Sequence, residues 1–284
     1  MEINGVNLFQ TLEIFGHSGI CIAPEKAQLL KNSLSLLTHE NHFDKTYYWG
    51  KINGVKNDYY IAYGYSKDCL KNRVYFYSMN CNDWWLLLKV NESEELITPL
   101  VSAPFQGDPT FISTVHVDEL LSYNNDEKII KVYQTGGLLY NLKEENRLAA
   151  TVKLVTDEAM IIPRGSWIKR PNGDITENEA FEGLDLNKAL QTKYYLHTRL
   201  SQKSKTYNVM SSSFHEYAFD FLDNLEGDVP KGCWIIQPHL RHNMVIIRSM
   251  YWPGMTFYQQ INSLNHGCLY VGNGIKNFSV PFMI

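Results

Sequence analysis

Two pairs of histidines are the residues whose type and spacing come closest to a metal site. His39 and His42, and again His239 and His242, stand three positions apart, a spacing that could place two imidazoles beside a zinc ion on one side of a helix. Both pairs fall in stretches predicted to be loops, and neither is accompanied by a cysteine or carboxylate pattern that would complete a ligand set. We therefore predict no metal-binding residues.

A catalytic site can also be assembled from residues that are distant in sequence. The best candidates for such a dispersed site are His215, Glu216 and Asp220, whereas a solvated turn explains the charged residues between 226 and 231. The chain has no Gly-x-Ser-x-Gly motif and no phosphate loop, and Gly272-Asn273-Gly274 lacks the third glycine of a dinucleotide site. We predict no catalytic and no cofactor-binding residues and expect a protein that is not an enzyme, with the dispersed site kept as an alternative.

The overall charge argues against a polyanionic partner. The chain has 26 Lys and Arg against 30 Asp and Glu, a formal net charge of -4, whereas nucleic-acid-binding modules usually carry a basic excess. Hydrophobic residues make up 44% and aromatic residues 13%, which predicts a folded chain. Its 18 tyrosines and 6 tryptophans favour a surface that meets other proteins.

The cysteines and the hydropathy pattern predict an intracellular, soluble protein. The five cysteines are widely separated in no paired spacing, which is typical of reduced structural thiols. We find neither a secretory signal nor a stretch long and apolar enough to span a bilayer, so we expect no membrane association.

The elements that must position these side chains are clearest at the C-terminal end. Residues 230–284 contain four short β-branched and aromatic runs separated by Pro, Gly and Asn, which predict a four-stranded antiparallel meander with a corner at Trp252-Pro253-Gly254. Such a sheet needs a cover from the preceding chain, because one face would otherwise lie open to water.

The N-terminal segment, 1–43, is predicted to be helical within the same domain. We expect helices over 6–14 and 24–38, the second packing through a stripe of Ala27, Leu30, Leu34 and Leu37. A hairpin follows, with strands at 47–52 and 58–64 and a turn at Asn53-Gly54.

The second strand of this hairpin is unusually aromatic on one face. Tyr59, Ile61, Tyr63 and Tyr65 alternate onto that face. We predict that it packs in the core, but an exposed aromatic face could bind a glycan or a peptide. The burial of these tyrosines decides between the two interpretations.

The middle of the chain predicts a mixture of short elements. Strands are expected at 74–78, 129–134 and 160–163. Helices are expected at 117–123, 143–157 and 214–225 and after Asp185, with Leu148, Val152 and Val155 inside and Glu144, Glu145, Arg147 and Lys153 outside. Residues 91–95 are predicted to be a solvated loop, and 201–213 a mobile loop or linker that limited proteolysis should cut first. We therefore predict one domain, 1–284, of the α+β class: antiparallel β-meanders and hairpins covered by several short helices.

Motifs along nearly the whole chain resemble the radial spoke head protein 9 family of motile cilia, which is related to radial spoke head proteins 4 and 6. The likeness departs chiefly in the loops 91–100, 133–140 and 201–213. The motifs that carry it, in order, are Trp49–Ile52, Asp58–Ala62, Gly107–Pro109, Arg147–Leu148, Ile162–Gly165, Phe181–Leu184, Asp228–Trp234, Arg248–Gly254, Thr256–Tyr258, Tyr270–Gly272 and Val280–Met283.

This resemblance implies a structural, non-catalytic subunit of the radial spoke head, located in the cytoskeleton of the ciliary or flagellar axoneme. A member of this family would hold the head that contacts central pair projections and would relay mechanical signals that control dynein-driven beating. Its partners would be radial spoke head proteins 4 and 6 and other spoke subunits. In a two-fold head, two copies of the chain would also meet.

Overall fold

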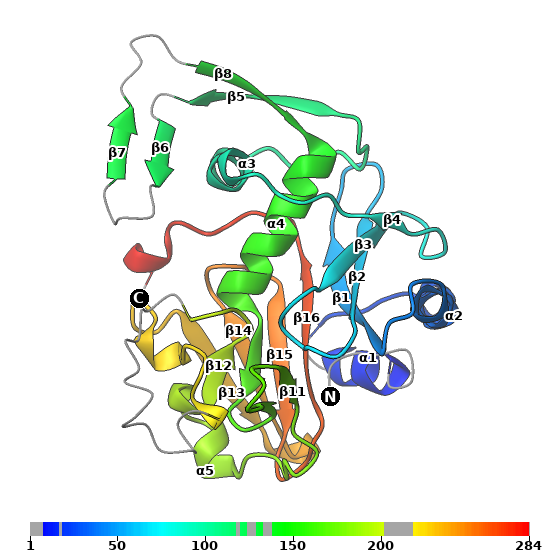
Figure 1. The fold of residues 1–284 in the computed structure, drawn as a ribbon, viewed down its shortest axis with the longest axis vertical. Helices are drawn as coiled ribbons and strands as arrows, with labels where there is room; N and C mark the ends of the chain where they lie inside the picture. Colours follow the sequence, from blue (N-terminus) through cyan, green and yellow to red (C-terminus); the bar gives the residue numbers. More distant parts are fainter. Residues whose placement is uncertain are drawn as a thin grey trace.

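An eight-stranded mixed sheet is the centre of the computed structural model, which describes residues 8–16, 19–117, 120–123, 129–132, 138–201 and 218–283 (Figure 1). The strand order is β13-β14-β15-β16-β1-β2-β3-β4, and helices cover both faces. The α+β prediction is therefore confirmed. The strands of this sheet are β1 (Lys45–Ile52), β2 (Tyr59–Tyr65), β3 (Val74–Ser78), β4 (Trp85–Leu86), β13 (Trp234–His239), β14 (Met244–Ser249), β15 (Met255–Gln260) and β16 (His266–Gly272).

The predicted meander and hairpin both form. Strands β13 to β16 pair antiparallel in sequence order, with Trp252–Gly254 at the corner between β14 and β15. Strands β1 and β2 also pair antiparallel, but their last partners are Ile52 and Tyr59. The connection is thus longer than a two-residue Asn-Gly turn, because Gly54 forms a bridge to Phe105 instead.

A parallel pairing of β1 with β16 joins the two halves into one sheet. Gly50 lies opposite Tyr270 in this pairing, beside a β-bulge in β1. Its φ is +145°, and a Cβ at this position would lie 2.1 Å from the backbone oxygen of Tyr270. Only glycine allows so close an approach of the two backbones.

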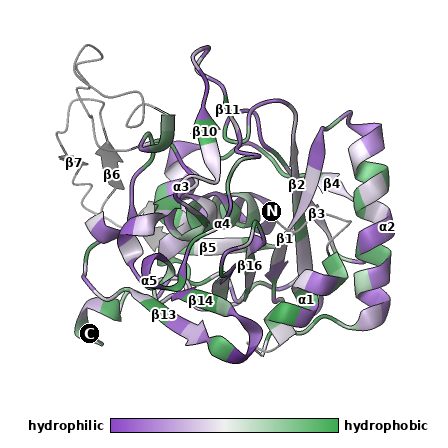
Figure 2. Ribbon diagram, turned by 90° about the horizontal axis from the view of Figure 1, so that it is seen from below, coloured by the Kyte–Doolittle hydropathy of each residue, from purple (hydrophilic) through white to green (hydrophobic). Residues whose placement is uncertain are grey.

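Helices α1 (Leu8–Gly16) and α2 (Pro24–Glu40) cover one face of the sheet. The predicted stripe of α2 is buried, with Leu30 and Leu34 against Tyr48 and Tyr60 of the hairpin. Polar and apolar residues alternate along α2 in Figure 2, as expected for a helix that packs through one side.

Helix α4 (Glu144–Ala159) crosses the other face, where it buries the aromatic side of β2 (Figure 1). Tyr59, Tyr63 and Tyr65 are at most 3% exposed. The interpretation of this face as an exposed glycan- or peptide-binding platform is therefore wrong. At the β14–β15 end of the same sheet, β9 (Ile161–Pro163), β12 (Tyr195–His197) and α5 (Leu186–Ala189) complete the cover, and Asp185 caps α5 as predicted.

Residues 92–100 are helical, which corrects the solvated loop predicted over 91–95. Asn91 and Glu94 form a reciprocal capping box at the start of α3 (Glu92–Ile97), which continues into the 3-10 turn η1 (Thr98–Leu100). Glu94 is buried and accepts a hydrogen bond from Asn146 Nδ2 at 2.6 Å. The acidic composition suggested solvent exposure, but acidic residues also favour the first turn of a helix.

The helix predicted at 117–123 is wrong for the residues that the structure describes there, because Val117 and residues 120–123 lie in strands. Strand β5 (Ile112–Val117) pairs with β8 (Leu138–Lys143), and β6 (Leu120–Tyr123) pairs with β7 (Ile129–Val132), where a strand was predicted. Strand pairing here overrides the local helical pattern. Further short elements are β10 (Trp167–Lys169), β11 (Ile175–Glu177), η2 (Thr192–Tyr194), η3 (Leu225–Gly227), η4 (Leu240–His242) and η5 (Val280–Phe282).

The loop and the helix predicted over 201–225 fall largely on residues that the structure does not describe. Of the predicted loop 201–213 only Ser201 is described, and the rest lies outside the described residues. Of the predicted helix 214–225, residues 214–217 also lie outside. Residues 218–219 are helical, but residues 220–224 are not, and Leu225 begins the 3-10 turn η3, so the predicted α-helix is wrong there.

Candidate functional site

Glu144, at the start of α4, is a buried carboxylate that was predicted to face solvent. Its side chain is fully buried. Oε1 accepts hydrogen bonds from the Tyr59 hydroxyl at 2.7 Å and from the backbone N–H groups of Gly107 and Asp108 at 2.8 and 3.1 Å. Oε2 accepts one from the Gln106 N–H at 2.8 Å. Four donors therefore replace the water that this charge loses on burial.

Arg147 lies one turn further along α4 and holds the same loop from its other end. Its Nη2 donates to the backbone oxygen of Ala103 at 2.7 Å, and the guanidinium lies 4.1 Å from the centre of the Phe105 ring. Burial lowers the pKa of Arg147 to about 10, partly offset by nearby Glu144. The pair thus clamps residues 103–108 between α4 and β2. Since water does not reach it, this cluster is suited to holding the fold.

The sequence contained a signal for this clamp that the prediction did not use. Glu144 and Arg147 are three residues apart, and Arg147 directly precedes the buried Leu148 on the apolar side of the helix. Charged residues were assigned to the solvent side by type, although spacing placed these two beside the core.

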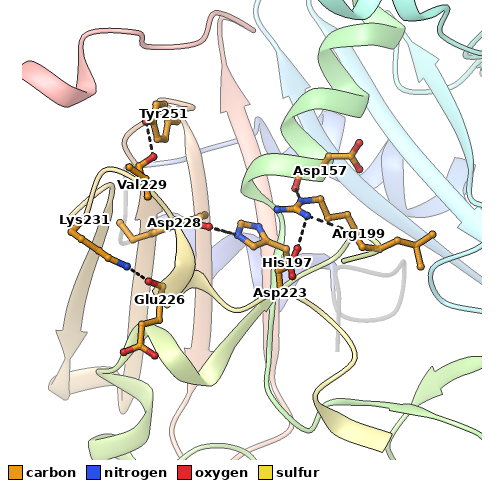
Figure 3. A network of polar contacts seen from close by, with 11 residues as sticks. Asp157, His197, Arg199, Asp223, Glu226, Asp228, Val229, Lys231 and Tyr251 are labelled. Atoms are coloured by element: carbon orange, nitrogen blue, oxygen red, sulfur yellow. Dashed lines mark hydrogen bonds and ion pairs between the residues drawn. The ribbon is translucent and has the colours of Figure 1, made fainter. Parts of the chain in front are cut away.

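A second polar cluster joins β12 to the segment that leads into β13 (Figure 3). His197 is 2% exposed, and its Nε2 lies 3.0 Å from both carboxylate oxygens of Asp228. Trp234 Nε1 donates to Asp228 at 2.7 Å. Burial alone would raise the pKa of Asp228, but the bonds from His197 and Trp234 outweigh it, so the pKa is lowered. The prediction of a purely solvated turn at 226–231 is therefore wrong for Asp228.

Arg199 extends this cluster toward the end of α4, as Figure 3 shows. Its Nε donates to the backbone oxygen of Asp157 at 2.8 Å, and Nη1 donates to Asp223 at 2.9 Å. Asp223 also accepts a hydrogen bond from the Ser201 hydroxyl at 2.6 Å. These bonds tie the end of α4 to the residues just after β12 and to the segment before η3.

A histidine beside a carboxylate is also the start of a catalytic arrangement, which requires a nucleophile or a substrate next to the imidazole. No hydrogen bond joins His197 to a serine, threonine or cysteine within the described part of the chain. An adjacent cavity of about 400 Å³ is lined by Lys276 and Glu158, which pair with each other at 2.7 Å. The charges at this cavity are thus engaged in ion pairs rather than directed at an open position.

Of the three residues of the predicted dispersed site, the structure describes only Asp220. Asp220 forms an ion pair with Arg164, while His215 and Glu216 lie outside the described residues. The rings of His239 and His242 stack with centroids 5.8 Å apart. Within the described ranges, no group of three or more His, Cys, Asp or Glu side chains could hold a metal ion.

The predictions for cysteines and membrane spans can also be compared with the structure. All five cysteines are free thiols. None of the helices among the described residues has the length and apolar character needed to cross a bilayer.

Comparisons with known proteins place this architecture in a defined class. Residues 1–76 match the family model of the radial spokehead-like proteins. Radial spoke head protein 9 homologs from Bos taurus and Homo sapiens are each 36% identical over 278 residues, covering 98% of this chain and 99% of the relative. The homolog from Danio rerio is 33% identical over 279 residues, with the same coverage. The chain therefore belongs to the radial spoke head protein 9 family, as the motifs predicted.

Proposed function

We propose that this chain is a structural, non-catalytic component of the radial spoke head in the axoneme of a motile cilium or flagellum. It acts as one domain, 1–284, that keeps the head rigid where central pair projections touch it and passes the mechanical signal toward the dyneins. Its neighbours are radial spoke head proteins 4 and 6 and other spoke subunits, with a contact between two copies in a two-fold head.

The observation that carries this proposal is the family relationship over the whole length of the chain, 98% of it at 36% identity. The fold supports a mechanical role, because two buried charge clusters tie α4 to loops and strands on both of its sides. Buried hydrogen bonds and ion pairs of this kind hold the elements that they join in one arrangement.

Removal of the gene from the ciliated organism that encodes this chain tests the proposal. We expect axonemes with absent or incomplete spoke heads and impaired swimming, and recovery on re-expression of the wild-type chain. The double variant His215→Ala, Glu216→Ala should restore swimming equally well, because a scaffold needs no dispersed catalytic site. Complete heads and normal swimming without the chain would contradict the proposal.

A further inference from the structure

An apolar groove runs beside β4, the strand that forms one edge of the main sheet. The cavity measures about 920 Å³ and lies between β3 and β4, helix α4 and the residues after β12. Leu86 and Leu88 line it although they are 56% and 48% exposed, and Val152 of α4 lines it from the opposite side. Exposed leucines around a groove of this size mark a binding surface rather than ordinary surface variation.

The backbone of β4 is open along this groove. β4 is the last strand in the order of the sheet and, among the residues that the structure describes, pairs only with β3. The Leu87 N–H donates to the Tyr75 oxygen, and bonded positions alternate along an antiparallel pair. The N–H and C=O groups of Leu86 therefore face away from β3, where another strand can pair with them.

The opposite edge of the sheet, strand β13, is protected against pairing with another strand, whereas the β4 edge is not. The edge strand β13 contains Pro238, which has no N–H, and exposed Gln237 next to it. Proline and polar residues are common means of keeping an edge strand from pairing with another chain. Residues 85–90 contain no proline, and exposed Trp85 adds further apolar surface.

The charged residues of the groove are mostly cationic in a chain that is acidic overall. Arg73, Lys89, Lys153 and Arg199 line it, against Asp157 as the one carboxylate among the described lining residues. Lys153 pairs with Glu95 at 2.5 Å and Arg199 with Asp223 at 2.9 Å.

Lys89 is exposed and forms no ion pair with any residue that the structure describes. A partner with a carboxylate at this point would complement it.

We infer that the groove binds an extended segment of a partner protein, which adds as a strand to β4. Its apolar side chains occupy the groove between Leu88 and α4, and an acidic side chain faces Lys89. Strand addition supplies affinity through the main chain and specificity through alternate side chains. The inference rests on the proposed function in that the partner is a protein subunit, and it names the surface that this subunit uses.

Selection of binders from a random linear peptide library on the purified full-length chain tests the inference. We expect selected sequences in which apolar residues alternate and at least one Asp or Glu is present. Their affinity should fall about tenfold or more for Leu86→Asp and for Leu88→Asp. Leu36→Asp, an equally exposed leucine on α2, is the matched control and should leave the affinity unchanged.

Two further measurements separate strand addition from general stickiness. N-methylation of alternate backbone positions in a selected peptide should abolish binding in one register and not in the other. Lys89→Glu should lower the affinity for the acidic peptide. A peptide with Lys in place of its acidic residue should bind the Lys89→Glu variant more tightly than the acidic peptide does.

The inference is overturned if no peptide is selected, if selected peptides bind Leu88→Asp as tightly as the wild type, or if both N-methylated registers bind. It is also overturned if the wild-type chain dimerises and Leu88→Asp is monomeric, because a second copy then occupies the groove. These outcomes concern the groove alone. The chain can therefore be a spoke head component even if the groove binds no strand, and the groove can bind a strand even if the chain is located elsewhere.

Discussion

The buried carboxylate of Glu144 gives the sharpest test of how the fold is held together. In Glu144→Gln the side chain keeps its size, but it loses its charge and places an NH₂ donor where one carboxylate oxygen stood. If the remaining oxygen keeps its place at Tyr59, Gly107 and Asp108, the new NH₂ group faces the Gln106 N–H, so two donors oppose each other.

The loss of stability expected for Glu144→Gln follows from the four hydrogen bonds of the carboxylate. Bonds to a charged acceptor contribute about 1.5–3 kcal/mol each and neutral bonds about 1 kcal/mol, and a buried unpaired donor costs about 1–3 kcal/mol. Three weakened bonds and one opposed pair give a loss of about 3–5 kcal/mol in the free energy of unfolding. Such a loss is a large part of the 5–15 kcal/mol typical of a folded protein.

Urea denaturation followed by tryptophan fluorescence measures this loss, provided that the slope against urea concentration is the same in both proteins. Glu145→Gln is the matched control, because Glu145 is the next residue on the helix and its side chain is partly exposed, with hydrogen bonds to the Tyr77 hydroxyl and Lys143. It should change stability by no more than about 1 kcal/mol. A loss below about 1 kcal/mol for Glu144→Gln would refute the reasoning.

Two further predictions concern the sheet junction and the second polar cluster. Gly50→Ala should lower the free energy of unfolding by more than about 3 kcal/mol, because its Cβ would collide with the Tyr270 backbone. Gly16 has open space around it, so Gly16→Ala is the control and should change stability little. Thermal and urea denaturation measure both variants. The pKa of Asp228 is lowered in the folded chain, so its stabilisation is present above the unfolded pKa, near 4, and is lost as pH falls through the lower folded value. Asp228→Asn should therefore flatten the acid limb of a stability-against-pH curve, and an unchanged limb would contradict the assignment.

Local sequence patterns predicted the elements whose partners are close in the chain. The C-terminal meander and the β1–β2 hairpin follow from alternating runs and turn residues, and the buried face of α2 follows from its helical spacing. The parallel pairing of β1 with β16 did not follow, because no local signal links residues more than 200 positions apart. The presence of Gly50 within an apolar strand was the one indication of a close backbone approach.

The polar clusters were harder to predict because they depend on tertiary contacts. Glu144 looks like an ordinary solvent-facing residue until the loop 106–108 brings three N–H groups to it. Asp228 likewise acquires its role only when β12 places His197 beside it. The aromatic face of β2 left two interpretations open, and only the position of α4 decided that it is core.

The location of the chain in the axoneme tests the central claim most directly. A tagged copy that restores a strain lacking the chain can be located by cryo-electron tomography of its cilia. We predict that the label lies in the head of the radial spokes, at the end nearest the central pair. A label confined to the spoke stalk, to the doublet surface or to the soluble fraction would contradict the claim that this chain is a spoke head component.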